Sequence, residues 1–169
     1  MQSNSSTKKM VRKPGRTLVV KTNQTLSTEG LTGLVNSSYT SNGSAFFVFD
    51  TIENSKNAFK VLKGNNEKVK FAHYRLFFTL SGVNDNVSYN DLKTAHINWI
   101  TANSNADVLY YKQYRKETKF LGCGDFTIDT KESMDKLLDK EGLKNFTFDS
   151  YTGVNYRYNN KKPDVEIAL

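Results

Sequence analysis

Two stretches of nine residues decide the fold: Gly43-Ser44-Ala45-Phe46-Phe47-Val48-Phe49-Asp50-Thr51 and Gly122-Cys123-Gly124-Asp125-Phe126-Thr127-Ile128-Asp129-Thr130. They align without a gap, and an amphipathic segment follows each of them. Side chains alternate between the two sides of a strand. One side of each stretch carries a matching set, which we expect to face the helices: Ala45, Phe47 and Phe49 in the first, Gly124, Phe126 and Ile128 in the second. The alignment indicates two similar units in tandem.

The elements around each stretch follow the same order. In the first half we expect a strand at 17–21, a weak helix at 26–35 and a hairpin at 37–50 around Asn42-Gly43. A helix should follow, with Ser55, Ala58, Phe59 and Leu62 on one face, and Gly64-Asn65-Asn66 should end it. A further strand begins at 69. In the second half we expect strands at 74–80, 108–114, 120–129 and 145–148, a helix over 89–99, and a helix through 134–138 that Gly142 ends. Asp129 or Thr130 would cap that last helix.

The two halves have no linker between them. The strand at 70–73 runs directly into the strand at 75–80. Two sheets joined in this way should be held at a nearly fixed angle, because a flexible spacer is missing. We expect a composite surface or an oligomerisation edge rather than two independently moving domains.

With its flanking elements, the repeated stretch resembles the RNA recognition motif (RRM), whose third strand carries a glycine- and aromatic-rich octamer. The first-strand hexamer of that family is matched well by Leu76-Phe77-Phe78-Thr79-Leu80 and loosely by Leu18-Val19-Val20. The resemblance covers roughly residues 16–81 and 74–155. It implies an α+β chain of two fused βαββαβ ferredoxin-like domains, each a four-stranded antiparallel sheet backed by two helices.

The resemblance also implies where bases would stack. The three stacking positions of the family fall on Val19, Ser44 and Phe46 in the first copy, and on Phe77, Cys123 and Asp125 in the second. Each copy thus keeps one aromatic of three. An exposed carboxylate at Asp125 would repel phosphate.

Further aromatic and basic residues are candidates for the same surface. Tyr110, Lys112 and Tyr114 alternate along one strand, and two readings stay open: the tyrosines face outward as stacking platforms, or they pack on the helices. Tyr156, Arg157 and Tyr158 belong to a segment at 156–169 that we interpret as a basic, aromatic tail.

The 24 Lys and Arg residues against 17 Asp and Glu give a net charge of +7. The basic residues gather in a predicted disordered arm at 1–15 and its border (Lys8, Lys9, Arg12, Lys13, Arg16) and at the end of the predicted strand at 108–114 and just after it (Lys112, Arg115, Lys116, Lys119). Such clustering is typical of a surface that meets a polyanion. The alternative is a solubilising tail with solvated strand edges.

The sequence lacks the residues that several classes of protein require. No apolar run approaches the roughly 20 residues that span a bilayer, and the N-terminus does not resemble a secretory signal. Cys123 is the one cysteine, and His73 and His96 are the two histidines, so triads and His- or Cys-based metal sites have little material. We therefore expect that the chain is not an enzyme and that it binds neither a metal nor a cofactor.

Two hypotheses follow. The first is a non-enzymatic, intracellular protein that binds single-stranded nucleic acid, RNA before DNA, mainly by electrostatics. The alternative is a protein-interaction or assembly module that has lost its stacking face, alone or as a homo-oligomer. The Asn- and Lys-rich composition and the fused tandem are also similar to small proteins of large DNA viruses, which would place the chain in a virus factory or a virion.

Overall fold

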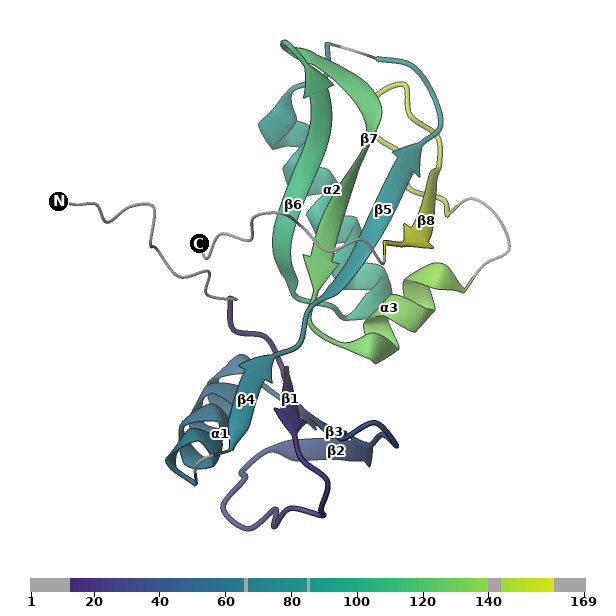
Figure 1. Ribbon diagram of the computed structural model, residues 1–169. Coiled ribbons are helices and arrows are strands. Elements are labelled where there is room, and N and C mark those ends of the chain that lie inside the picture. Colours follow the sequence, from purple (N-terminus) through teal and green to yellow (C-terminus); the bar gives the residue numbers. More distant parts are fainter. Residues whose placement is uncertain (1–12, 66, 85, 140–143, 160–169) are drawn as a thin grey trace, which may run out of the picture.

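The computed structural model describes residues 13–65, 67–84, 86–139 and 144–159. Two four-stranded antiparallel sheets follow one another along the chain (Figure 1). Sheet A, in the order β2-β3-β1-β4, consists of β1 (Thr17–Lys21), β2 (Leu34–Tyr39), β3 (Ser44–Phe49) and β4 (Lys68–Phe71). Sheet B, in the order β6-β7-β5-β8, consists of β5 (Tyr74–Leu80), β6 (Val108–Lys116), β7 (Lys119–Ile128) and β8 (Val154–Tyr158). The described helices are α1 (Ile52–Gly64), α2 (Tyr89–Ser104) and α3 (Lys131–Leu138). The predicted class, α+β with two fused RRM-like units, is confirmed.

The helix predicted at 26–35 is wrong, so sheet A has one helix instead of two. Gly30 and Gly33 adopt φ values of 80° and 81°, a left-handed conformation that a right-handed helix does not contain. The segment forms an irregular loop in which Leu31 is buried in the core. The loop is tied to β3 because the Asp50 N–H donates to the Gly33 carbonyl at 3.0 Å.

The predicted hairpin and helix starts agree with the structure. Asn42-Gly43 lies in the turn between β2 and β3, although Gly43 alone of the two has a positive φ, 91°. Each described helix begins after a hydroxyl residue whose oxygen accepts a backbone N–H of the first turn: Thr51 for α1, Ser88 for α2 and Thr130 for α3. Helix α1 ends at Gly64, as predicted, whereas α3 ends at Leu138, before Gly142, which lies outside the described residues.

The last strand of sheet B lies later in the chain than predicted. Residues 145–148 form no strand; single bridges at Lys144 and Phe148 join them to the segment that follows. The strand is β8, which pairs with β5. Tyr156 was predicted in an exposed tail, but it lies in β8 and is buried in the core.

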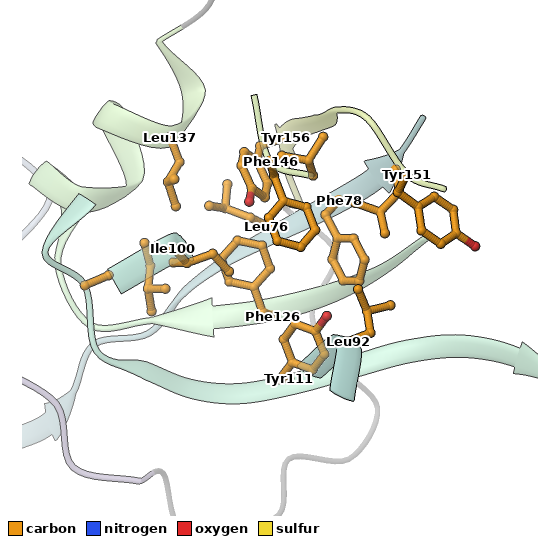
Figure 2. Packing of buried hydrophobic residues seen from close by; sticks show 14 of the residues in the cluster. Leu76, Phe78, Leu92, Ile100, Tyr111, Phe126, Leu137, Phe146, Tyr151 and Tyr156 are labelled. Atoms are coloured by element: carbon orange, nitrogen blue, oxygen red, sulfur yellow. The ribbon is translucent and has the colours of Figure 1, made fainter. Parts of the chain in front are cut away.

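The core of sheet B is rich in aromatic rings that gather between the sheet and its helices (Figure 2). His96 of α2 sits fully buried among them. Its Nδ1 lies 2.8 Å from the Tyr111 hydroxyl, and its Nε2 lies 2.8 Å from the Tyr156 hydroxyl. Burial lowers the pKa of His96 to about 3, so the ring is neutral at pH 7.

The connection between the sheets consists of Ala72 and His73 (Figure 1). The buried side chains have odd numbers in β4 (Val69, Phe71) and even numbers in β5 (Leu76, Phe78, Leu80). Because alternate side chains of an extended chain point to opposite sides, this change of parity places the helices of the two sheets on opposite sides. The open faces of the two sheets therefore do not form one composite surface.

An ion pair joins the two halves. The Arg16 guanidinium donates from Nε to the Asp129 carboxylate at 2.6 Å, and the Asp129 side chain is fully buried. The hydrogen bond to Asp129 raises the pKa of Arg16. Thr17 adds a hydrogen bond of 2.7 Å from its hydroxyl to the Asp129 carbonyl. Arg16 was predicted to meet nucleic acid, but its charge is used inside the protein.

The start of the described chain is also tied down. The Gly15 carbonyl accepts a hydrogen bond of 2.7 Å from the buried Ser55 hydroxyl, and the Lys13 carbonyl lies 2.9 Å from the His73 ring. Residues 13–15, which we expected in a disordered arm, are part of the fold.

Among the described residues, no helix is long and apolar enough to cross a membrane.

We expect Asp129→Ala to lower the free energy of unfolding by about 3–5 kcal/mol, because it leaves the largely buried Arg16 guanidinium without its main partner. Asp107→Ala is the matched control. Asp107 lies 3.5 Å from the same guanidinium but is 50% exposed, and the expected loss is below about 1 kcal/mol. Urea unfolding measures both losses, and equal losses would contradict the role given to Asp129.

We expect acid to destabilise the protein through His96. The pKa is lower in the folded chain, about 3, than its ordinary value of 6.5, so the unfolded chain binds the proton more readily. This contribution to stability is complete above pH 6.5 and decreases as the pH falls toward 3, by up to about 1.4 kcal/mol per pH unit. Denaturant unfolding at pH 7, 6, 5 and 4 measures the slope. His96→Gln should be less stable at pH 7 but should have a flatter slope; an unchanged slope would assign the acid sensitivity to other groups.

Candidate nucleic-acid interface

The strand positions to which the RRM resemblance assigns base stacking include residues on the open face of each sheet. On sheet A, Val19 and Phe46 are register partners on the open face. On sheet B, Phe77 is the register partner of Asp125. Phe46 and Phe77 are both half-buried, with the neighbouring strand residues turned into the core.

Asp125 is not an exposed carboxylate. The residue is 1% exposed. Its Oδ2 accepts a hydrogen bond of 2.8 Å from Arg75 Nη2 and one of 2.7 Å from the Tyr114 hydroxyl. The expected repulsion of phosphate assumes an exposed and unpaired charge, and the structure has neither. Asp125 instead holds Arg75 and Tyr114 in place on the open face.

The tyrosines of β6 face outward, which decides between the two readings that the sequence left open. Tyr110 and Tyr114 lie half-buried on the open face, while Tyr111 and Gln113 are buried on the helix side. The Tyr114 ring meets the Phe77 ring edge-on, with 6.3 Å between the centroids. Burial, followed by the hydrogen bond to Asp125, raises the pKa of Tyr114, so its hydroxyl stays protonated.

Two cations lie against these rings. The Arg157 guanidinium carbon is 5.2 Å from the Phe77 ring centroid, and Lys112 Nζ is 5.8 Å from the Tyr114 ring centroid. Both side chains are exposed and neither has a carboxylate partner among the described residues. The open face of sheet B thus combines aromatic surface with positive charge.

Several other predicted site residues lie elsewhere. Arg115 lies on the same side of β6 as the buried Gln113, two residues before it, and therefore points away from the open face. Its guanidinium lies over the Phe120 and Tyr89 rings and donates to the Val87 carbonyl at 3.0 Å. Arg115 therefore serves the fold.

The remaining basic candidates are spread out. Lys116 and Lys119 are register partners at the exposed end of the β6–β7 hairpin. Tyr158 lies at the end of β8, beside sheet A rather than on the open face of sheet B. Lys8, Lys9 and Arg12 lie outside the described residues.

Sequence reasoning missed four cations on the open faces. Arg75 lies beside Asp125 on sheet B. Lys21, Lys68 and Lys70 lie on the open face of sheet A, where Lys21 pairs with Lys68 and Lys70 with Val19. The signal was present as the alternation Lys68-Val69-Lys70, in which Val69 alone is buried.

Metal binding and thiol chemistry find no support among the described residues. These residues contain no group of three or more His, Cys, Asp or Glu side chains that could hold a metal ion. Cys123 lies on the open face of sheet B, where burial raises the pKa of its thiol, so it has little thiolate character at neutral pH.

No family model matches the chain, and no curated protein does. Among solved structures, the C. elegans NONO-1 homodimer matches 93% of this chain and 68% of its own chain, with 14% identity and a TM-score of 0.42. The Sxl-lethal protein/RNA complex matches 86% of this chain and 99% of its own, with 15% identity and a TM-score of 0.37. The Sex-lethal RNA recognition domains 1 and 2 of Drosophila melanogaster match 86% of this chain and 100% of their own, with 16% identity and a TM-score of 0.35. At such identities, and with TM-scores below 0.5, the function of this chain has to be inferred from its own residues.

Proposed function

We propose that this chain is a non-enzymatic protein that binds single-stranded nucleic acid on the open face of sheet B. One observation carries the proposal. Three rings (Phe77, Tyr110, Tyr114) and two unpaired cations (Lys112, Arg157) share that face, and its one carboxylate, Asp125, is buried and paired.

The rings supply a stacking surface for unpaired bases. Stacking on an aromatic side chain contributes about 1–3 kcal/mol per base and does not depend on the base. A base that stacks on Phe77 would displace the Arg157 guanidinium, which can then meet a phosphate or cover the base. A duplex keeps its bases stacked on each other, so this surface favours single strands.

RNA is the first partner in this proposal. Asn155 and Thr79 are register partners on the same face, and both side chains are exposed. An amide and a hydroxyl beside the rings can hydrogen-bond a 2′-hydroxyl, the group by which a protein distinguishes RNA from DNA. The proposal places the protein inside the cell and, for a chain of viral origin, in the virus factory or the virion.

An assembly module is the second candidate, and one observation favours it. Strand β2 forms an edge of sheet A without any charged residue, and its Val35 is 66% exposed. Uncharged strand edges pair readily with other chains. This function would use sheet A, whereas the first uses sheet B.

We expect Phe77→Ala to weaken the binding of single-stranded RNA by about 1–3 kcal/mol, because it removes one stacking ring. Phe46→Ala is the matched control, since Phe46 is the equivalent ring on sheet A, and its affinity should change by less than about twofold. Fluorescence anisotropy measures the affinity, and light scattering measures the mass in solution. An unchanged affinity for Phe77→Ala, or a fall from oligomer to monomer for Phe46→Ala, would favour the assembly module.

The basic arm should add to the affinity for nucleic acid a contribution that does not depend on the base sequence. We expect the slope of log affinity against log salt to be about −0.7 for each phosphate neutralised, so that removal of residues 1–12 flattens it by about 2 if Lys8, Lys9 and Arg12 each meet a phosphate. The deletion should stop at residue 12 because Gly15 and Arg16 are hydrogen-bonded within the fold. An unchanged slope would limit the interface to sheet B.

A further inference from the structure

A groove of about 1280 Å³ lies between the open face of sheet A and helix α3 of the second half. Six side chains with large apolar surfaces line it: Val35, Phe46 and Val48 from sheet A, Met134 from α3, Tyr74 from the start of β5 and Tyr158 from the end of β8. The change of parity at Ala72-His73 turns the open face of sheet A toward this helix. Phe46 therefore faces a wall of protein rather than open solvent.

The groove does not suit nucleic acid or a small molecule. Its α3 wall presents Glu132, Asp135 and Asp139 against Lys131 and Lys136, and Lys131 is paired with Asp135 at 2.9 Å. A phosphate chain would gain no net attraction there. The volume also exceeds the roughly 300–1,000 Å³ of small-molecule sites. The apolar lining and mixed charge fit a short segment of polypeptide.

A segment of this chain starts at the groove. Tyr158 lines it, and Asn159 follows immediately, with its N–H held by the Arg75 carbonyl at 3.0 Å. Residues 160–169 read Asn-Lys-Lys-Pro-Asp-Val-Glu-Ile-Ala-Leu. Ten residues reach up to about 35 Å when extended, which is enough to cross a small sheet. In an extended chain Val165, Ile167 and Leu169 would share one side.

The charges of the segment complement those of the groove. Lys161 and Lys162 come first, and Asp164 and Glu166 alternate with the apolar residues. The α3 wall offers carboxylates for the former and Lys136 for the latter. An intramolecular partner also has a high effective concentration, which compensates for a small contact area.

We propose that the segment 160–169 docks into this groove of its own chain, with Val165 and Ile167 against Phe46 and Met134. The docked segment covers the one aromatic stacking position that sheet A retains. It leaves the open face of sheet B uncovered and gives the two sheets different tasks. This inference does not depend on what sheet B binds.

The test measures access to the groove in the full chain. Ser38 lines the groove from β2, and its side chain is exposed. A cysteine at this position, Ser38→Cys in a Cys123→Ser background, therefore reports on docking through its rate of reaction with a thiol reagent. We expect Val165→Asp with Ile167→Asp to raise that rate by about tenfold or more, because a covered site reacts through its open state. Asp164→Asn with Glu166→Gln is the matched control for the segment and should raise the rate less than the apolar pair does. Thr79→Cys, on the open face of sheet B, should react equally in all these backgrounds.

Three results would overturn the proposal. The first is an unchanged rate for Ser38→Cys in the Val165→Asp, Ile167→Asp background. The second is an equal increase at Thr79→Cys, which would indicate general loosening of the fold. The third is protection of Ser38→Cys that grows with protein concentration together with a doubled mass, which would assign the groove to a second copy of the chain.

Discussion

The connection of two residues between β4 and β5 constrains the rest of the molecule. With only Ala72 and His73 available, the chain passes from one sheet to the next nearly as one strand, so the parity of the buried residues decides which way each sheet faces. The buried Arg16–Asp129 pair lies beside this connection, where the Thr17 carbonyl accepts from the Ala72 N–H at 2.9 Å, and it fixes the same arrangement. A buried charge without its partner is costly, so this ion pair penalises any other arrangement of the halves.

The second sheet departs from the RRM pattern at Asp125, and the departure is compensated locally. Arg75 on β5 neutralises the carboxylate, and Tyr114 on β6 donates its hydroxyl to it. Three neighbouring strands are thereby joined across the open face by side chains as well as by backbone hydrogen bonds. The tyrosines of β6 supply aromatic surface that the octamer lacks, and Asp125 orients one of them, Tyr114. Asp125 therefore supplies no ring at its position but holds the Tyr114 ring on the same face.

The sequence was most informative where local chemistry and burial agree. The alternation through Phe46 and Phe126, the Asn42-Gly43 turn and the stop at Gly64 all predict the observed elements. The sequence was least informative where contacts between residues far apart in the chain determine the position of a side chain. Tyr156 was predicted in a tail, but its hydroxyl lies 2.8 Å from His96 in the core. Arg115 was predicted as a surface cation, but its guanidinium lies over the Phe120 ring. The helix expected at 26–35 is absent because Gly30 and Gly33 adopt positive φ angles, and the segment reaches the core of sheet A from an irregular loop.

The repeat in the sequence does not make the two halves equivalent. Sheet A keeps Phe46 but faces α3, and its lysines lie on the far strands β1 and β4. Sheet B keeps Phe77, gains two tyrosines and faces away from sheet A. In this fixed geometry the two octamers stand in different surroundings: Phe46 lies beside α3, and Phe77 lies beside Tyr114 of β6.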